Sequence, residues 1–362
     1  MRCATLLNLT AILAGAHSVA AFVKVLAVLC TFVTCKGGVT DAAIYSLRGS
    51  ISPGAMANMA TDSPLDTLRP MSLVSDTADT FAAAQDIGAA WVRVWMFEGS
   101  QGLTVDGNGY ITGMTSQFQT NFWNMLWYAN YYGIQVYPTF FNYAPGTSNF
   151  NVANFFTNSA AQTSLINNLI VPLCAQWGSH SNIVAWELYN ELNGFANPYF
   201  SGGNVVAMSD AQAWVKATTA AMKQHSSKPV SVSQIMISDS YHPVGTSNKD
   251  YVGLGLDFYN IHVYNDQGTL PVASAFGLDK PVYLGEFGET TASGDQHQND
   301  VVYNFIKAAQ SGGWAGALYW CLGFKGDYQQ NPATSCPDSS LMYSLFNCEG
   351  TARQAYTTFK YL

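Results

Sequence analysis

The chain has 362 residues, a formal net charge of −8 and only 15 lysines and arginines. No basic cluster is present that could neutralise a phosphate backbone, so nucleic acid is not an expected partner. Hydrophobic residues make up 48% and charged residues 10% of the chain. The core can therefore be large while the surface depends on neutral polar residues, which favours an extracellular setting.

Residues 1–36 have the composition of a targeting segment. The stretch from Ala4 to Val23 contains no charged residue, and a second apolar run follows Lys24. Short apolar runs of this kind serve as secretory signals, and two together can form an uncleaved membrane anchor. We expect a signal peptide, with small residues near Ala20 for cleavage, and a secreted protein. An uncleaved anchor is the alternative.

The rest of the chain alternates between helical and strand patterns. A short apolar stretch at 43–47 is a candidate first strand, and residues 106–109 form a hairpin-type turn. Helices are expected at 77–88, 116–132, 165–177, around 214–222, 301–312 and from about 352. Strands are expected at 90–95, 134–141, 183–189, 230–237, 258–263, 281–288 and 316–320.

This alternation predicts an α/β protein with parallel strands and right-handed crossovers. A strand count near eight favours a closed (β/α)8 TIM barrel over an open sheet. The sequence shows no linker, and about 250 residues plus loops suit one barrel. We therefore expect a single catalytic domain over residues 37–362.

Two of the expected strands end in glutamate. The run from Ile183 to Tyr189 leads to Asn190 and Glu191, where Asn193 and Gly194 predict a turn. The second strand leads to Glu286, which lies between two glycines. The C-terminal ends of parallel barrel strands are where catalytic groups collect. Two glutamates on different strands are what glycosidic bond cleavage requires, because one protonates the leaving oxygen and the other attacks the anomeric carbon or activates water.

Four short motifs in barrel order carry a resemblance to a known family. They are WELYNE ending at Glu191, HVY at His262 to Tyr264, LGEFG around Glu286, and ALYW ending at Trp320. From about Asp76 to Trp320 the chain resembles the retaining (β/α)8 glycoside hydrolases, most closely family 5, which includes cellulases and endo-β-mannanases. The resemblance implies that Glu191 is the general acid/base and Glu286 the nucleophile.

The same resemblance implies roles for the residues around the two glutamates. Asn190 would bind the sugar 2-hydroxyl, His262 would line the site, and Trp320 would form a platform beneath the sugar. Arg93 and Tyr264 would keep Glu286 ionised, because a nearby positive charge and donated hydrogen bonds lower a carboxylate pKa. Each of these residues also has a structural reading, as a core salt bridge, a hydrogen-bonded barrel residue or a packed ring.

The end of the third expected strand separates two branches of this family. Family cellulases usually have a histidine there, whereas this chain has Asn142, which is similar to the mannanase branch. We count Asn142 among the substrate-binding candidates. The substrate alternatives remain mannan, a β-glucan such as cellulose, or a smaller β-glycoside. Glu187 and Glu289 are rival carboxylates that we interpret as supporting or surface residues.

The leading hypothesis is a retaining β-glycoside hydrolase, an endo-acting β-1,4-mannanase or β-1,4-glucanase on β-linked polysaccharide. The alternatives are an inactive glycan-binding barrel, an exo-acting β-glycosidase, and an unrelated barrel enzyme. The last would need a phosphate site or a Schiff-base lysine, and the sequence shows neither. We expect a monomer without cofactor, metal or nucleic acid, and without membrane contact unless the leader is an uncleaved anchor.

The cysteines predict one disulfide. Cys336 and Cys348 flank a loop rich in proline, serine and glycine, and in a secreted chain they would clip that loop. Cys174 lies in a helical pattern and is expected to be a free buried thiol. No CxxC or HExxH motif occurs, which is why no metal site is expected.

Overall fold

The computed structural model describes residues 72–97, 100, 102–141, 152–196, 206–236, 248–322, 343–347 and 350–362. Side chains are described from residue 78 onward. The expected leader, the candidate strand at 43–47, Asn142 and the cysteine pair Cys336 and Cys348 lie outside these residues. The expectations about them stay predictions.

The centre of the molecule is a set of parallel strands that form two four-stranded sheets. The first sheet has the order β1 (Trp91–Trp95), β4 (Gln135–Phe141), β5 (Trp186–Tyr189), β6 (Val230–Ser231). The second has the order β10 (Ala317–Tyr319), β9 (Val282–Phe287), β8 (Tyr259–His262), β7 (Ser233–Ile235). Only Val232 separates β6 from β7, so the strand expected at 230–237 is interrupted. Among the described strands, β10 and β1 are not paired.

The strands curl around one shared interior. A buried cluster separate from the main core contains Trp91 of β1, Tyr137 of β4, Tyr283 of β9 and Leu318 of β10. The rings of Trp91 and Tyr283 stack with their centroids 5.3 Å apart. Because alternate residues of a strand point to the same face, these residues form one inward layer at the beginnings of the strands. This layer is the floor beneath the site.

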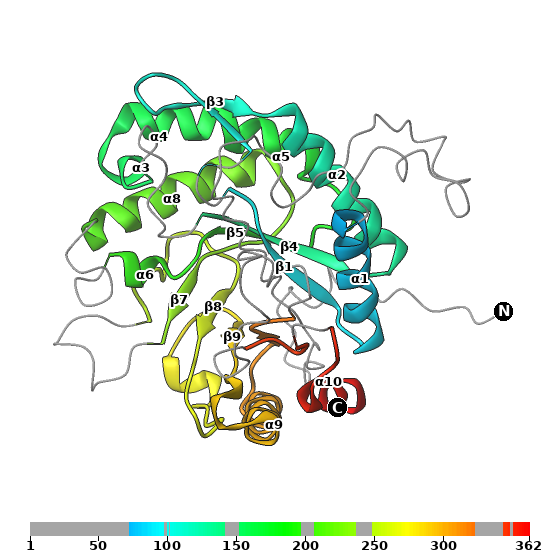
Figure 1. The fold of residues 1–362 in the computed structure, drawn as a ribbon. Helices are drawn as coiled ribbons and strands as arrows, with labels where there is room; N and C mark the ends of the chain where they lie inside the picture. The colour runs from blue at the N-terminus through cyan, green and yellow to red at the C-terminus, as the bar shows by residue number, and fades with distance from the viewer. Residues whose placement is uncertain are drawn as a thin grey trace.

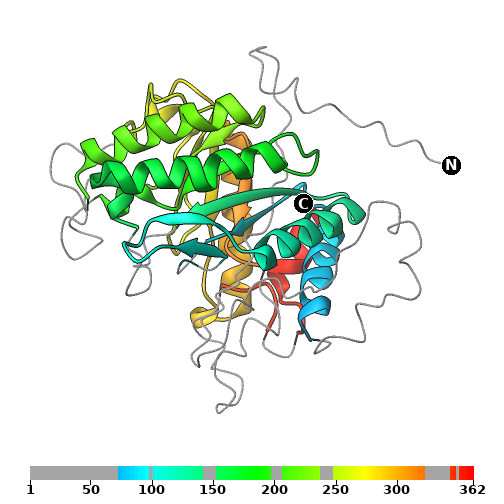
Figure 2. The same cartoon turned by 90° about the horizontal axis from the view of Figure 1, so that it is seen from above.

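Helices surround the strands on the outside (Figures 1 and 2). They are α1 (Ser72–Asp86), α2 (Ser116–Tyr131), α3 (Asn154–Thr157), α4 (Ser159–Leu165), α5 (Val171–Trp177), α6 (Leu192–Phe195), α8 (Met208–His225), α9 (Asp295–Ser311) and α10 (Gln354–Tyr361). A π-helical turn, η4 (Ile166–Ile170), joins α4 to α5, and 3-10 turns lie at η5 (Ala273–Phe276) and η6 (Thr291–Ser293). An antiparallel hairpin, β2 (Leu103–Val105) and β3 (Ile111–Met114), contains the expected turn. None of the described helices is both long and apolar enough to span a bilayer.

Local signals in the sequence explain where helices begin and end. The Thr115 side chain accepts a hydrogen bond from the Phe118 backbone N–H at 3.1 Å and begins α2. Gly88 and Gly133 follow α1 and α2 with φ of 72° and 67°. This left-handed conformation ends a helix and suits glycine. The helices and strands expected at these boundaries are confirmed to within a few residues.

The turn expected at Asn193 and Gly194 is wrong, because both residues lie in the short helix α6. The Asn193 side chain donates to the Ile235 carbonyl at 2.9 Å and accepts from the Ile235 N–H at 2.8 Å. A side chain that satisfies both backbone groups of a strand end fixes the helix against β7. The sequence signal for a turn was therefore overridden by a tertiary contact.

The helix α10 lies over the unpaired side of the strands and contacts α1. Lys360 and Tyr356 each bind the Asp86 carboxylate, at 2.7 Å and 2.8 Å. Phe359 packs on Phe287 and Tyr319, with ring centroids 6.4 Å and 5.2 Å away. The helix thus covers β9 and β10 while it is tied to the helix that precedes β1 (Figure 2).

The two described cysteines differ. Cys174 is free and buried, as expected, and burial raises the pKa of its thiol to about 12. Cys321 is disulfide-bonded, so its partner lies outside the described residues. The proposed pairing of Cys336 with Cys348 stays a prediction.

The close approach of β8 and β9 generates a stability prediction at Gly285. A Cβ atom at this position would lie 1.1 Å from the Asn260 Oδ1 atom. We expect Gly285→Ala to lower the free energy of unfolding by about 1–3 kcal/mol or more, as overpacking does. Gly107→Ala is the matched control, because nothing lies within 4 Å of its Cβ position. Urea unfolding that gives equal midpoints for both variants would contradict this account.

Candidate active site

The buried side chain of Arg93 is the centre of the candidate site. Its Nε atom donates to Glu187 Oε2 at 2.9 Å and its Nη2 atom to Glu187 Oε1 at 2.5 Å. The remaining nitrogen, Nη1, donates to Glu286 Oε1 at 2.5 Å, and Nη2 also donates to Asn190 Oδ1 at 2.8 Å. One guanidinium, fully buried, therefore binds a carboxylate and an amide from β5 and its end, and a second carboxylate from β9.

Glu187 is held from the other side as well. The Asn260 amide donates to Glu187 Oε2 at 3.0 Å and to the Tyr137 hydroxyl at 3.4 Å. A fork-to-fork pair between arginine and a carboxylate is the strongest geometry for such a contact. Glu187 thus fixes Arg93 from below, between the aromatic floor and the mouth of the barrel.

Glu286 lies on β9 with only 5% of its surface exposed. The Tyr264 hydroxyl donates to its Oε2 atom at 2.8 Å, and His262 Nδ1 lies 3.5 Å from the same oxygen. The register between β8 and β9 shifts at this point. That irregularity follows Gly285 and places the Glu286 side chain among these partners.

Glu191 follows β5 in an unusual backbone conformation. Its φ of 49° is in the left-handed region that L-residues seldom adopt. The Glu191 N–H donates to Ser233 Oγ at 2.9 Å, which holds this conformation in place. Its Oε1 atom lies 2.8 Å from His262 Nδ1. Strained residues of this kind occur at functional sites, and sequence reasoning did not foresee the strain.

The two glutamates of the prediction converge. One carboxylate oxygen of each, together with a His262 ring nitrogen, lie within 4.8 Å of one another. Ligand atoms this close could also hold a divalent cation. The three residues come from three strands, so no short sequence motif marks this set. The arrangement equally places an acid and a nucleophile on either side of one bond.

The pKa of Glu286 differs from the expectation. Burial raises the pKa of its carboxyl above the ordinary value, and the Glu191 charge adds to the rise, although His262 and Arg93 act in the opposite direction. For Glu187, burial is outweighed by the charge and hydrogen bonds of Arg93, so its pKa is lowered. The expected lowering by Arg93 and Tyr264 is present at Glu286, but it does not prevail, because Arg93 gives Glu187 the two-point contact.

The other predicted site residues lie around this centre. Asn190 is buried beside Arg93. At Tyr264, burial of the hydroxyl group and the charges of Glu286 and Glu191 raise the pKa well above its ordinary value. Its phenol therefore stays a donor. Trp320 follows β10, and its ring meets that of Trp95 edge-on at 6.2 Å. Asn142 lies outside the described residues.

Sequence reasoning missed several residues that support the site. Trp95, whose ring lies 4.9 Å from the Arg93 guanidinium carbon, is two positions from Arg93 in the same strand. Asn260 is likewise two positions before His262. Residues two apart in a strand point to the same face. That alternation was the signal that could have found both.

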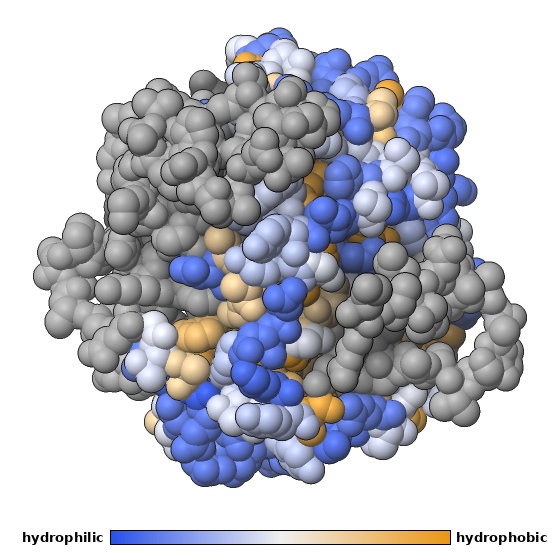
Figure 3. All heavy atoms as spheres, turned by 90° about the vertical axis from the view of Figure 1, so that its right-hand side faces the viewer, coloured by the Kyte–Doolittle hydropathy of each residue, from blue (hydrophilic) through white to orange (hydrophobic). Residues whose placement is uncertain are grey.

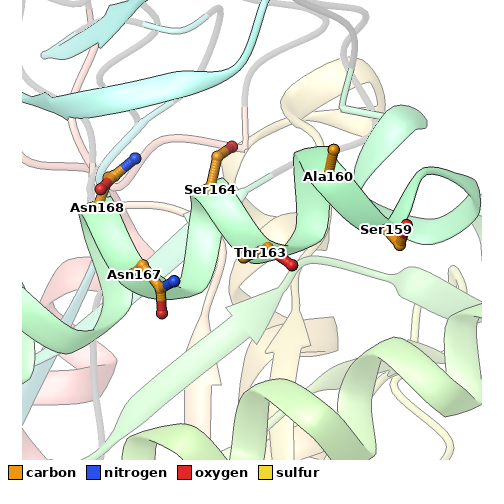
Figure 4. Close-up of a pocket in the computed structure, with 6 residues that line it drawn as sticks. All are labelled: Ser159, Ala160, Thr163, Ser164, Asn167 and Asn168. Carbon is orange, nitrogen blue, oxygen red and sulfur yellow. The ribbon is translucent and has the colours of Figure 1, made fainter.

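A shallow hollow of about 410 Å³ lies on the surface away from these carboxylates. Figure 4 shows that its lining comes from consecutive turns of one helix, α4 with the start of η4. The lining residues are Ser159, Ala160, Thr163, Ser164, Asn167 and Asn168. None of them titrates near neutral pH, so this hollow lacks acid/base chemistry.

Parallel strands with a pair of glutamates at their C-terminal ends define a glycoside-hydrolase type of site on a (β/α)8 fold. No protein-family model matches the chain. The mannan endo-1,4-beta-mannosidase of Cryptopygus antarcticus is 26% identical over 312 residues, 74% of this chain and 77% of the relative. That of Mytilus edulis is 23% identical over 279 residues, 67% of this chain and 75% of the relative.

The fold of this chain also matches a solved structure. The X-ray structure of the Mytilus edulis beta-mannanase matches with a TM-score of 0.57 at 21% identity, over 68% of this chain and 80% of that one. The predicted (β/α)8 fold and the predicted resemblance to glycoside hydrolases are thus confirmed.

The opposite pKa shifts of the two buried glutamates predict opposite effects on stability at pH 7. The raised pKa of Glu286 means that its charged form is unfavourable above the unfolded pKa, so Glu286→Gln should raise the melting temperature. The lowered pKa of Glu187 stabilises the fold above the unfolded pKa and this contribution is lost in acid. Glu187→Gln should therefore cost about 3–5 kcal/mol, as breaking a buried ion pair does.

Both variants keep the side-chain size, so each is the control for the other. Thermal unfolding at a series of pH values from 7 downwards measures the effect. The difference between the variants should shrink as the pH falls through the lowered pKa of Glu187, because its carboxylate then becomes protonated in the wild type. A shift of the same sign in both variants at pH 7 would refute the assignment.

Proposed function

We propose that the protein is a retaining endo-β-1,4-mannanase that hydrolyses β-linked mannan with Glu191 as acid/base and Glu286 as nucleophile. The observation that carries this proposal is the short separation of the two carboxylates, of which one oxygen each lie within 4.8 Å of one another. Retaining glycosidases hold their carboxyl groups about 5–5.5 Å apart, whereas inverting enzymes leave about 6.5–9.5 Å for a water molecule.

The first step is attack by the Glu286 carboxylate on the anomeric carbon. The bond to the leaving oxygen breaks while Glu191 gives that oxygen its proton, which leaves a covalent glycosyl-enzyme. In the second step Glu191 takes a proton from water, the water oxygen attacks the anomeric carbon, and Glu286 departs as carboxylate. The two inversions give net retention of configuration.

The neighbouring residues support both steps. The hydrogen bonds from Arg93 and Tyr264 orient Glu286 and receive it again as a leaving carboxylate. His262 contacts both glutamates and keeps their separation constant as protons move. Asn190 beside the nucleophile suits the sugar 2-hydroxyl, and the Trp320 ring suits the apolar face of the sugar.

Mannan is the substrate that the relatives support. Both curated relatives described above are named mannan endo-1,4-beta-mannosidases. Asn142, at the expected end of the third strand, favours the mannanase branch of the family over the cellulase branch. A β-1,4-glucanase and an exo-acting β-glycosidase are the alternatives against which the substrate is tested.

The mechanism predicts different behaviour for the two alanine variants. Glu286→Ala should abolish turnover, because it removes the carboxylate that attacks the anomeric carbon. Glu191→Ala should slow mannan hydrolysis by about 10²–10⁴-fold, the usual contribution of a general acid. The same variant should slow an activated aryl mannoside far less in its first step, because that leaving group needs little protonation. Initial rates on both substrates measure the difference.

The configuration of the first product decides the roles. NMR of the nascent reducing end should show the β-anomer, and an inverted product would refute the assignment even if both glutamates proved essential. Reducing-sugar release from mannan, cellulose, mixed-linkage glucan and β-1,3-glucan identifies the substrate, with mannan expected to be fastest. Activity should persist in a chelator, and its loss would favour a cation at Glu191, His262 and Glu286.

We further propose that the protein is a secreted monomer with a cleaved leader, motivated by the uncharged run from Ala4 to Val23. N-terminal sequencing of the mature protein should find a first residue that lies after position 20. An intact Met1 on a membrane-bound product would reject cleavage. Sedimentation of the purified protein tests the monomer.

A further inference from the structure

The outward face of α2 carries a row of exposed aromatic rings that the candidate site does not use. We call Trp123, Trp127 and Tyr131 the aromatic stripe. Trp123 is 36% exposed and Tyr131 is 65% exposed, while Trp127 is half-buried. Large aromatic side chains bury most of their area in ordinary cores, so an exposed row on one helix indicates a binding surface.

The stripe follows the axis of the helix at a regular interval. Its residues are four positions apart, and at 1.5 Å per residue successive rings advance by about 6 Å. The Trp127 and Tyr131 rings are 19° from parallel with centroids 5.7 Å apart. At the other end, Trp123 meets His180 edge-on at 5.7 Å. This interval is comparable to the length of one β-1,4-linked pyranose, so a linear chain of sugars laid along the helix would meet Trp123 and then the stacked pair of Trp127 and Tyr131.

The helix that carries the stripe is neutral, while His180, which contacts Trp123, is titratable. The helix sequence, SQFQTNFWNMLWYANY, contains no charged residue, and exposed Asn130 offers an amide beside the rings. Aromatic faces stack on the apolar faces of sugars, and amides hydrogen-bond to hydroxyls. In Figure 3, which turns the right-hand side of Figure 1 to the viewer, the described surface is largely hydrophilic or neutral, with hydrophobic residues in small groups. Neutral carbohydrate fits such a surface better than an anionic membrane or a basic partner.

The stripe is remote from the carboxylates. It runs from the middle of α2 to its end, and only a few residues separate Tyr131 from Gln135, where β4 begins. The glutamates lie at the opposite, C-terminal ends of the strands. A sugar chain on the stripe would therefore lie along the outer wall of the barrel and would not enter the catalytic mouth.

We propose that the aromatic stripe is a second carbohydrate-binding site, which takes an extended β-1,4-linked mannan chain and holds the enzyme on insoluble polymer. The choice of mannan rests on the proposed function, whereas the existence of the surface does not. Binding at the stripe raises the local concentration of the catalytic mouth at the polymer, because the second contact becomes intramolecular. It adds nothing for short soluble substrates.

The test compares the double variant Trp123→Ala/Tyr131→Ala with Tyr361→Ala, which removes a ring that is 80% exposed on α10. Each protein also carries Glu286→Ala so that the polymer is not consumed. Depletion from solution by insoluble linear β-1,4-mannan measures binding. The double variant should bind with a Kd about tenfold higher, the loss of two aromatic contacts, and Tyr361→Ala should bind as the parent does.

A second measurement uses the same variants with Glu286 intact. The double variant should lose rate on insoluble mannan but keep its kcat/KM on a soluble manno-oligosaccharide and its melting temperature. Equal binding of all variants to insoluble mannan overturns the proposal. It is also overturned if sedimentation shows a dimer that the double variant converts to a monomer, because the stripe is then an interface between two chains.

If the proposed function is wrong, the experiments give a different result from that expected if only the aromatic stripe is wrong. In that case no polysaccharide in the panel is hydrolysed, while the double variant still loses its binding to insoluble mannan. Hydrolysis of mannan with unchanged binding in the double variant has the opposite meaning, since the enzyme is then confirmed and the stripe is not a binding site.

Discussion

The division of one buried positive charge between two carboxylates is the interaction on which the site depends. Arg93 gives Glu187 two hydrogen bonds and Glu286 one. A buried guanidinium without partners would be strongly unfavourable, so Glu187 is what allows Arg93 to lie inside the barrel at all. Glu286 receives a single hydrogen bond from Arg93, which orients its carboxylate but leaves most of its negative charge available for attack. A nucleophile that must first attack and later depart benefits from such partial neutralisation.

The barrel is the means by which these groups meet. Arg93 is 94 positions from Glu187 and 193 from Glu286, so no local structure could bring them together. Parallel strands around a common interior send one side chain after another to the same height. The aromatic floor below Arg93 excludes water, which strengthens each contact above it. The exceptional backbone features, Gly285 and the left-handed Glu191, occur where this regular pattern must be adjusted to place the two glutamates.

The sequence predicted the fold and most of the candidate site for identifiable reasons. Strand periodicity and glycine stops follow local rules, and Glu191, Glu286 and Arg93 stand at strand positions that those rules locate. The helix at Asn193, the pKa of Glu286 and the two-point contact of Glu187 with Arg93 could not be predicted in the same way. Each depends on a partner from a distant strand, and the balance between burial and charge at Glu286 emerges only when all its neighbours are in place.

The contact between α10 and α1 has a consequence for the order of folding. Lys360 and Asp86 lie 274 positions apart, and α10 also packs on β9 and β10 through Phe359. During synthesis α1 is made long before α10, and β9 and β10 also precede it. The part of β9 and β10 that Phe359 covers therefore stays exposed until α10 has been synthesised. The contacts of α10 form late, and contacts between such distant residues form slowly, so the nascent chain must spend that interval with apolar strand surface exposed to association.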